Sequence, residues 1–149
     1  MQKFEDLINK NKYQVFVFCC PAYFPFNYFR HPWFVLNKKG EISRWEIRHY
    51  INKKTLDYLF LNQQMPFEGT NMTYLINKKW NASLLGSIED DVAVKAIDFI
   101  ENSPKNYPYC KKYSYVGPNS NTYVQMVLNK FPKFNIKLSN RFIGKDFHV

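Results

Sequence analysis

The sequence has 149 residues, the length of one domain, so we expect a single globular domain over 1–149. Apolar residues make up 46% of the chain and aromatic residues 19%, a composition that excludes intrinsic disorder. The net charge is +9, but the basic residues come in scattered pairs such as Lys38-Lys39 and Lys111-Lys112. This scatter favours a solvated surface over a nucleic-acid-binding face, with peripheral contact at an anionic membrane left open.

The first half of the chain contains three predicted strands, at 13–20, 31–37 and 41–50. The first is continuously apolar, as in a strand buried on both faces. The other two flank the turn Asn37-Lys-Lys-Gly40, which is typical of a hairpin. Alternation along the third strand places Trp45, Ile47 and His49 on one face and Arg44, Glu46 and Arg48 on the other.

The region 51–80 gives no clear pattern, although Leu56, Leu59 and Phe60 suggest a helical turn. A helix is predicted over about 87–102, because Ser87 and Asp90 resemble a capping box ahead of an apolar stripe. The hydrophobic segment 22–30 precedes the second strand and is expected to cover or bind something. Together these elements predict an α+β fold, with a small antiparallel sheet packed against helices near 87–102 and 120–131.

The stretch Gly117-Pro-Asn-Ser-Asn-Thr-Tyr123 precedes the second helix. Gly-Pro ends the preceding element, and Asn, Ser and Thr are residues that cap helix N-termini. The apolar stripe that follows, when extended back by one turn, includes Ser120. The stripe therefore predicts that Ser120 lies at the helix N-terminus and faces the core. The alternative is that Ser120 or Asn119 serves only as the N-cap.

Cys19, Cys20 and Cys110 are an odd number of cysteines with two adjacent, which is a poor disulfide framework. The polar segment 1–12 does not resemble a secretory signal. We therefore expect a reducing, cytoplasmic location. The chain has no CxxC, HxH or HExxH spacing and no glycine-rich phosphate loop, so no metal or cofactor is predicted.

A possible catalytic constellation combines Ser120 with His31, which begins a strand directly before a proline. A nucleophile at a helix N-terminus that faces a histidine is the nucleophile–base pair of acyl-transfer enzymes. Glu46 is the first candidate to orient the His31 ring and His49 the second, although Glu46 could instead form a surface ion pair with a neighbouring arginine. Asn119 or the backbone N–H groups at the helix start are the candidate oxyanion donors.

Four segments carry a resemblance to a known family: His31-Pro-Trp, Arg44-Trp-Glu-Ile, the Gly117–Tyr123 heptad and Ile143-Gly-Lys-Asp-Phe147. In this order they resemble the bacterial family of domain of unknown function 3750, over about 31–147. More distantly, an early histidine and a late Asn-nucleophile pair resemble circularly permuted papain-like enzymes, of the lecithin–retinol acyltransferase type and the NlpC-type amidases. That resemblance implies a permuted papain-like fold.

The sequence departs from those enzymes at one position, because Asn119-Ser120 stands where they have Asn-Cys. The pKa of a cysteine thiol is about 8.5, and a helix N-terminus lowers it further. A serine hydroxyl has a much higher pKa and therefore needs a well-aligned base. Two hypotheses follow. The first is a hydrolase or acyltransferase that acts on an amide or ester of a peptide, glycan or acyl substrate. The second is a catalytically inactive module that binds a peptide, glycan or anionic partner. The sequence leaves the oligomeric state open.

Overall fold

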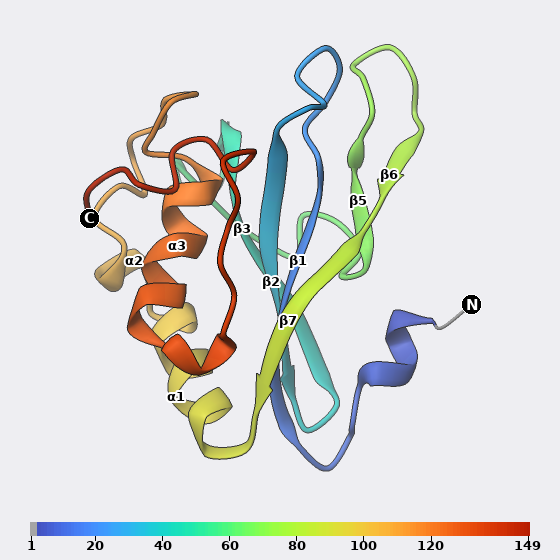
Figure 1. Ribbon diagram of the computed structural model, residues 1–149, viewed down its shortest axis with the longest axis vertical. Coiled ribbons are helices and arrows are strands. Elements are labelled where there is room, and N and C mark those ends of the chain that lie inside the picture. The colour runs from blue at the N-terminus through green and yellow to red at the C-terminus, as the bar shows by residue number, and fades with distance from the viewer. Residues whose placement is uncertain (1–2) are drawn as a thin grey trace.

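The computed structural model describes residues 3–149, and it has the predicted α+β architecture (Figure 1). Its centre is a five-stranded antiparallel sheet with the strand order β4-β3-β2-β1-β7. The strands are β1 (Tyr13–Pro21), β2 (Arg30–Lys38), β3 (Glu41–Asn52), β4 (Asp57–Leu61) and β7 (Ser83–Glu89). The strands predicted at 13–20, 31–37 and 41–50 are thus confirmed as the middle of a larger sheet.

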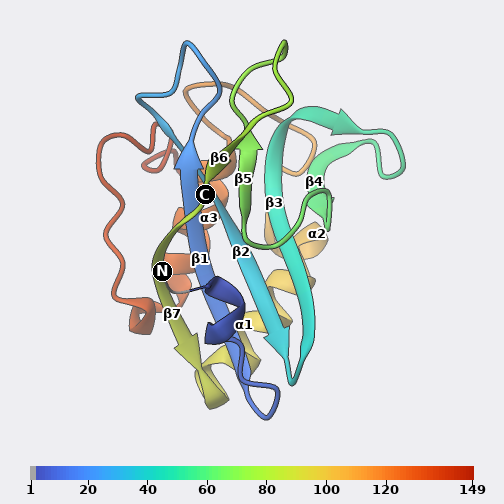
Figure 2. The same cartoon turned by 90° about the vertical axis from the view of Figure 1, so that its right-hand side faces the viewer.

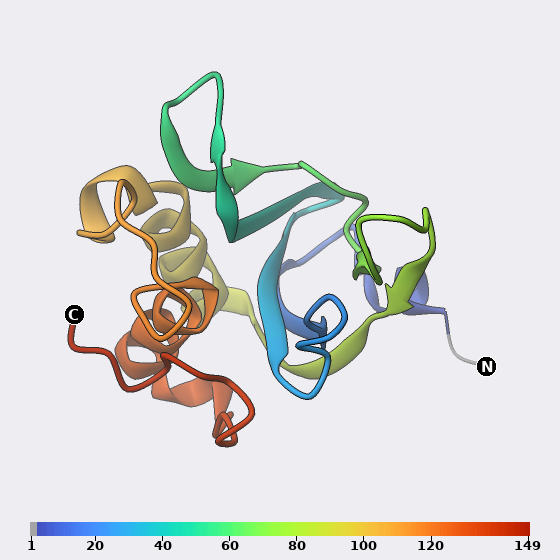
Figure 3. The ribbon, with the colours of Figure 1, turned by 90° about the horizontal axis from the view of Figure 1, so that it is seen from above.

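Three helices lie on one face of this sheet: α1 (Asp90–Glu101), α2 (Ser103–Asn106) and α3 (Ser120–Lys130). A two-stranded sheet of β5 (Glu68–Asn71) and β6 (Lys79–Asn81) lies on the other face, beside the short 3-10 helix η1 (Phe4–Leu7) (Figure 3). A final 3-10 turn, η2 (Pro132–Phe134), follows α3.

Because both faces of the central sheet are covered, the structure has two apolar cores. The larger core lies between the sheet and the helices and includes Val15, Val17, Phe34 and Tyr123. The smaller core lies on the other face and includes Phe16, Phe18, Trp33 and Val35, with side chains of η1 and β6 packed against it. This double burial explains why β1 is apolar at consecutive positions.

Two predictions about local structure are wrong. Ser87 lies within β7, and α1 begins at Asp90 without any side-chain cap, so the apparent capping box at Ser87 does not form. Leu59 and Phe60 belong to β4 rather than to a helical turn. In both places a short strand pairs with a distant or neighbouring strand, and that tertiary pairing outweighs the local helical spacing.

Among residues 3–149, no helix is long and apolar enough to cross a membrane.

Candidate active site

Helix α3 begins at Ser120, and Asn119 is its N-cap. The Asn119 side chain accepts hydrogen bonds from the backbone N–H groups of Asn121 (2.9 Å) and Thr122 (3.3 Å), and the Thr122 hydroxyl accepts from the Asn119 N–H (3.1 Å). This reciprocal capping box satisfies the first orphan N–H groups of the helix. Capping is therefore done by Asn119 and Thr122, which leaves the Ser120 hydroxyl available for another contact.

The segment around Ile143-Gly144 holds the start of α3 in place. Asn119 Nδ2 and Asn121 Nδ2 both donate to the Ile143 carbonyl, at 2.9 and 2.7 Å, and Thr122 Oγ1 donates to the Gly144 carbonyl at 2.7 Å. Gly144 has a φ of +92°, and a Cβ atom there would lie 2.5 Å from Asn119 Nδ2. The two motifs that the sequence singled out, the heptad and the Ile143–Phe147 ending, are thus parts of one structural unit.

Ser120 and His31 are brought together by this arrangement. Ser120 Oγ lies 3.2 Å from Nδ1 of His31, within hydrogen-bonding range. Both groups are largely buried, because Ser120 is 6% exposed and the His31 side chain is 14% exposed.

The other ring nitrogen of His31 contacts Glu46, since Nε2 lies 2.9 Å from Glu46 Oε1. Because an ionised carboxylate can only accept a hydrogen bond, Nε2 carries the proton in this contact. In the neutral ring Nδ1 is then the unprotonated nitrogen, and it accepts the Ser120 hydroxyl proton. The contact with Glu46 therefore selects the tautomer in which Nδ1 can act as a base toward Ser120.

Glu46 is a completely buried carboxylate held by two arginines. Arg44 Nε donates to Glu46 Oε2 at 2.6 Å, and Arg44 Nη2 and Arg48 Nη1 donate to Oε1 at 3.2 and 3.1 Å. The Arg44 guanidinium also lies 4.0 Å from the centroid of the Trp33 ring and donates to the carbonyls of Met65 and Glu68. The alternation predicted that these three side chains share a face. Residues 62–68 cover that face, so the ion pairs of Glu46 with Arg44 and Arg48 are buried and are not the surface pair offered as the alternative to the orienting role.

The end of the β2–β3 ladder explains how these residues can meet. Backbone pairing between β2 and β3 runs from Lys38↔Glu41 to Phe34↔Trp45 and stops there. His31 and Glu46 lie just beyond that point, where the two strands diverge (Figure 2). The side chains of His31 and Glu46 therefore come into contact beyond the end of the paired region. Ser120 contacts His31 from α3, which packs on the helical face of the sheet.

Burial and charge set the ionisation of the pair. Burial raises the pKa of Glu46, but the hydrogen bond from His31 and the charge of Arg44 outweigh that effect and hold the pKa well below its usual range. Burial lowers the pKa of His31, and the hydrogen bond to Glu46 only partly opposes that shift. At neutral pH the site therefore holds a carboxylate anion and a neutral imidazole.

The two candidate oxyanion donors differ in whether their N–H groups already donate hydrogen bonds within the protein. Asn119 Nδ2 donates both of its hydrogens to backbone carbonyls, of Tyr115 at 3.1 Å and of Ile143 at 2.9 Å, so this amide is engaged. Within residues 3–149 no acceptor is paired with the backbone N–H of Ser120 itself. Of the predicted donors, the N–H at the helix start is thus the one free to bind a ligand oxygen.

His49, the second candidate to orient His31, is placed elsewhere. Its Nε2 lies 3.0 Å from the Tyr74 hydroxyl, and its ring centroid lies 5.1 Å from that of Tyr23. Burial lowers the pKa of His49 to about 4, so this ring is neutral near pH 7. Glu46, and not His49, is the group in contact with His31.

All three cysteines are free and buried. Burial raises the pKa of both Cys19 and Cys110 to about 11, and the pKa of Cys20 is raised as well. None of these thiols is therefore activated as a nucleophile. Among the described residues 3–149, no group of three or more His, Cys, Asp and Glu side chains could hold a metal ion.

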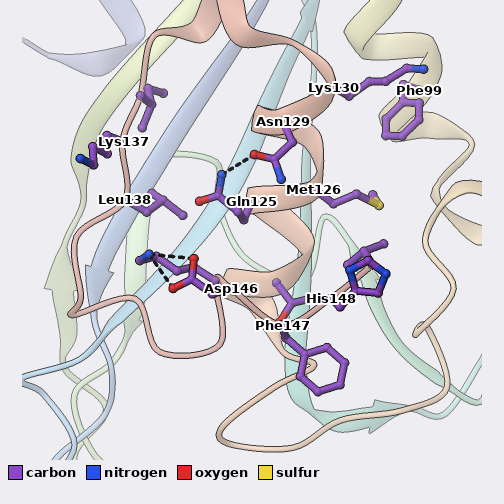
Figure 4. Close-up of a pocket in the computed structure, with 14 residues that line it drawn as sticks. Phe99, Gln125, Met126, Asn129, Lys130, Lys137, Leu138, Asp146, Phe147 and His148 are labelled. Carbon is purple, nitrogen blue, oxygen red and sulfur yellow. Dashed lines mark hydrogen bonds and ion pairs between the residues drawn. The ribbon is translucent and has the colours of Figure 1, made fainter.

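A separate groove of about 640 Å³ runs along the outer side of α3 (Figure 4). It lies between Phe99 of α1 and the C-terminal segment, with Gln125, Met126 and Asn129 of α3 along it. Ser120, His31 and Glu46 are not among the residues that line it. The groove is thus distinct from the catalytic candidate, which is almost closed to solvent.

Sequence reasoning placed Ser120, His31 and Glu46 as candidates but missed the supporting residues. Arg44 and Arg48 were visible only as the polar face of a strand, and nothing local showed that this face is covered. Asn121 and Thr122 read as capping residues. The joint presence of the heptad and the Ile143–Phe147 ending was the one signal that the two segments belong to the same site.

Comparison with known proteins supports the family resemblance that these motifs predicted. No curated protein and no solved structure matches the chain. The family described as "Protein of unknown function (DUF3750)" matches residues 12–147, which include His31, Glu46, Ser120 and the Ile143–Phe147 segment. The chain therefore belongs to the DUF3750 family.

Proposed function

We propose that the protein is a hydrolase or acyltransferase that attacks an amide or ester bond with Ser120. The observation that carries the proposal is the chain of contacts from Ser120 Oγ to His31 Nδ1 (3.2 Å) and from His31 Nε2 to Glu46 (2.9 Å). This is the order of a nucleophile, a general base and an orienting carboxylate. The distant resemblance to permuted papain-like enzymes implies the same reaction class.

In the first step His31 Nδ1 takes the Ser120 hydroxyl proton while Oγ bonds to the substrate carbonyl carbon. The buried Glu46 anion stabilises the imidazolium that forms, and the N–H of Ser120, at the helix N-terminus, donates to the oxyanion. The imidazolium then gives its proton to the departing amine or alcohol, which leaves an acyl-serine. Water, or an acceptor alcohol or amine, attacks the acyl-serine with His31 again as base, and the serine is regenerated.

Ser120 stands where the resembling enzymes have cysteine, so the reaction depends on its contact with a base. The helix N-terminus favours developing negative charge only modestly, so the hydroxyl needs direct proton transfer to a base. The lowered pKa of His31 keeps Nδ1 unprotonated at neutral pH, and its tautomer is fixed by Glu46. Serine chemistry thus depends on the exact His31–Glu46 contact more than a thiolate would.

The alternative proposal is a binding module without catalysis. It is favoured by the burial of Ser120, which is only 6% exposed, since a substrate carbonyl reaches Oγ only if the covering segments move. In that case the contacts among Ser120, His31 and Glu46 would only stabilise the fold. The two proposals differ in whether removing one oxygen atom at Ser120 abolishes a reaction.

The test is a panel of chromogenic esters and amides with the Ser120→Ala variant. We expect turnover by the natural sequence and a loss of about a thousandfold or more in the variant. Ser83→Ala is the matched control, because Ser83 is an exposed serine in β7 and its loss should leave turnover unchanged. Equal rates for Ser120→Ala and Ser83→Ala would overturn the proposal and leave the binding module.

A further inference from the structure

Three loops meet at the end of the molecule where α3 begins. They are 22–29 between β1 and β2, 72–78 between β5 and β6, and 113–117 ahead of α3, and they lie at the top of the views in Figures 1 and 2. The Phe24 N–H donates to the Met72 carbonyl at 2.8 Å, and the Tyr23 ring centroid lies 4.9 Å from that of Tyr74. Burial and the neighbouring hydroxyls of Tyr74 and Tyr115 raise the pKa of Tyr23. The three loops are therefore linked into one surface.

This surface is strongly apolar and exposed. Leu75 is 96% exposed, and the other exposed large apolar side chains on the three loops are Phe24, Phe26, Tyr28, Tyr74, Ile76, Tyr115 and Val116. Single exposed apolar residues are ordinary, but a contiguous group marks a site of interaction. Contact with water at these loops is thus costly, and a partner surface would relieve it.

The charged residues within these loops and their immediate sequence flanks are all basic. The segments 22–31, 72–79 and 111–118 contain no Asp or Glu, and their charged residues are Arg30, Lys78, Lys79, Lys111 and Lys112. Lys79 is paired with Glu68 at 2.7 Å, and the other four basic side chains form none of the ion pairs found among residues 3–149. An apolar surface with a basic border complements an apolar layer beneath negative headgroups.

We propose that the surface formed by loops 22–29, 72–78 and 113–117 docks on an anionic membrane surface. The composition favours a bilayer over a glycan, because Leu75, Ile76 and Val116 are aliphatic and offer no aromatic face for a sugar ring. Tyr is enriched at membrane–water interfaces, and Phe and Leu are typical of apolar faces that dock there. The surface comes from three separate loop tips, which can insert side by side between headgroups.

Docking would place the start of α3 toward the bilayer. Asn119, next to Ser120, donates through Nδ2 to the Tyr115 carbonyl, so the loop 113–117 adjoins the catalytic candidate. If the proposed reaction holds, the bond attacked would then belong to a lipid or a lipid-linked molecule. The docking itself does not depend on that reaction, and its test uses no turnover.

The experiment is co-sedimentation of the full chain with vesicles of phosphatidylcholine, alone or mixed with phosphatidylserine. We expect binding to the mixed vesicles, weaker binding to phosphatidylcholine alone, and weakening with added salt. Leu75→Glu should lower the affinity by at least about tenfold, because it removes an inserted apolar side chain and adds a negative charge. Lys78→Glu should lower it by about fivefold or more through charge alone.

Val94→Glu is the matched control, since Val94 is an exposed apolar residue of α1, away from the three loops. Its binding should equal that of the natural sequence, and Ser120→Ala should also bind normally. No binding to mixed vesicles would overturn the proposal, as would an equal loss in Val94→Glu and Leu75→Glu. Normal vesicle binding by the natural sequence, with no turnover of any substrate by that same protein, would leave the docking proposal standing and count against the proposed reaction alone.

Discussion

Nδ1 of His31 and Oγ of Ser120 lie 3.2 Å apart, although 89 positions of sequence separate the two residues. His31 is the second residue of the central strand β2, and Ser120 is the first residue of α3, which packs on the same sheet. The contact is fixed from both sides, by Glu46 behind the imidazole and by the Asn119 capping box beneath the serine. This double fixation is what makes the pair a candidate for chemistry.

The reactivity of Ser120 should depend on pH through His31. Only the neutral imidazole accepts the hydroxyl proton, and burial lowers the pKa of His31 below its ordinary value near 6.5. The rate at which a fluorophosphonate probe modifies Ser120 should therefore be constant above about pH 6.5. It should fall only at lower pH, where His31 becomes protonated. A rate that keeps rising in proportion to hydroxide above pH 7 would show that His31 is not the base.

Ser120→Cys should create a reactive thiol. The helix N-terminus and His31 both favour a thiolate there, whereas the natural cysteines are buried and have raised pKa values. Iodoacetamide at neutral pH should therefore modify the variant rapidly, at position 120, and the natural sequence slowly. Adding His31→Gln to Ser120→Cys should slow the modification by about tenfold or more. Equal rates with and without His31 would contradict the pairing.

Glu46→Gln should destabilise the fold by about 3–5 kcal/mol, because it leaves the buried guanidinium of Arg44 without its anion. The change also removes the acceptor that sets the His31 tautomer. Urea unfolding measures the loss in free energy. Glu68→Gln is the matched control: it breaks an exposed ion pair with Lys79 and should cost less than about 1 kcal/mol. Equal losses would mean that Glu46 is not held as a buried anion.

Gly144→Ala should weaken both the fold and the site. The φ of +92° strains any L side chain, and the new Cβ would lie 2.5 Å from Asn119 Nδ2, against the N-cap of α3. Gly40→Ala separates the two effects, since Gly40 has a φ of +100° but its Cβ would meet only Lys10 at 3.6 Å. In urea unfolding, Gly144→Ala should lose more stability than Gly40→Ala, and only Gly144→Ala should reduce labelling at Ser120.

The sequence predicted the centre of the fold because its signals are local. The apolar run of β1 and the hairpin turn at 37–40 define three adjacent strands. Strands β5 and β6 are short and polar, and β7 joins the sheet only by pairing with β1, 70 or so residues earlier in the chain. Such pairings leave little trace in local periodicity, so the local pattern at Ser87 indicates a helix cap although the residue belongs to β7.

The candidate site also contains residues that local sequence patterns predict and residues whose role depends on tertiary structure. Helix-capping residues and the histidine before Pro32 are local features, so Ser120 and His31 could be named from sequence. The burial of Glu46 could not, because it depends on the segment 62–68 folding over a strand face whose residues are charged. Alternation gave the shared face of Arg44, Glu46 and Arg48 correctly, and tertiary structure decided which face meets solvent.

The most direct test of the account is to treat the protein with a fluorophosphonate probe and map the modified residue by mass spectrometry. We predict a single adduct on Ser120, absent in Ser120→Ala and strongly reduced in His31→Gln, with Ser83→Ala unchanged. An unmodified Ser120, or equal labelling with and without His31, would contradict the central claim that His31 activates Ser120 as a nucleophile.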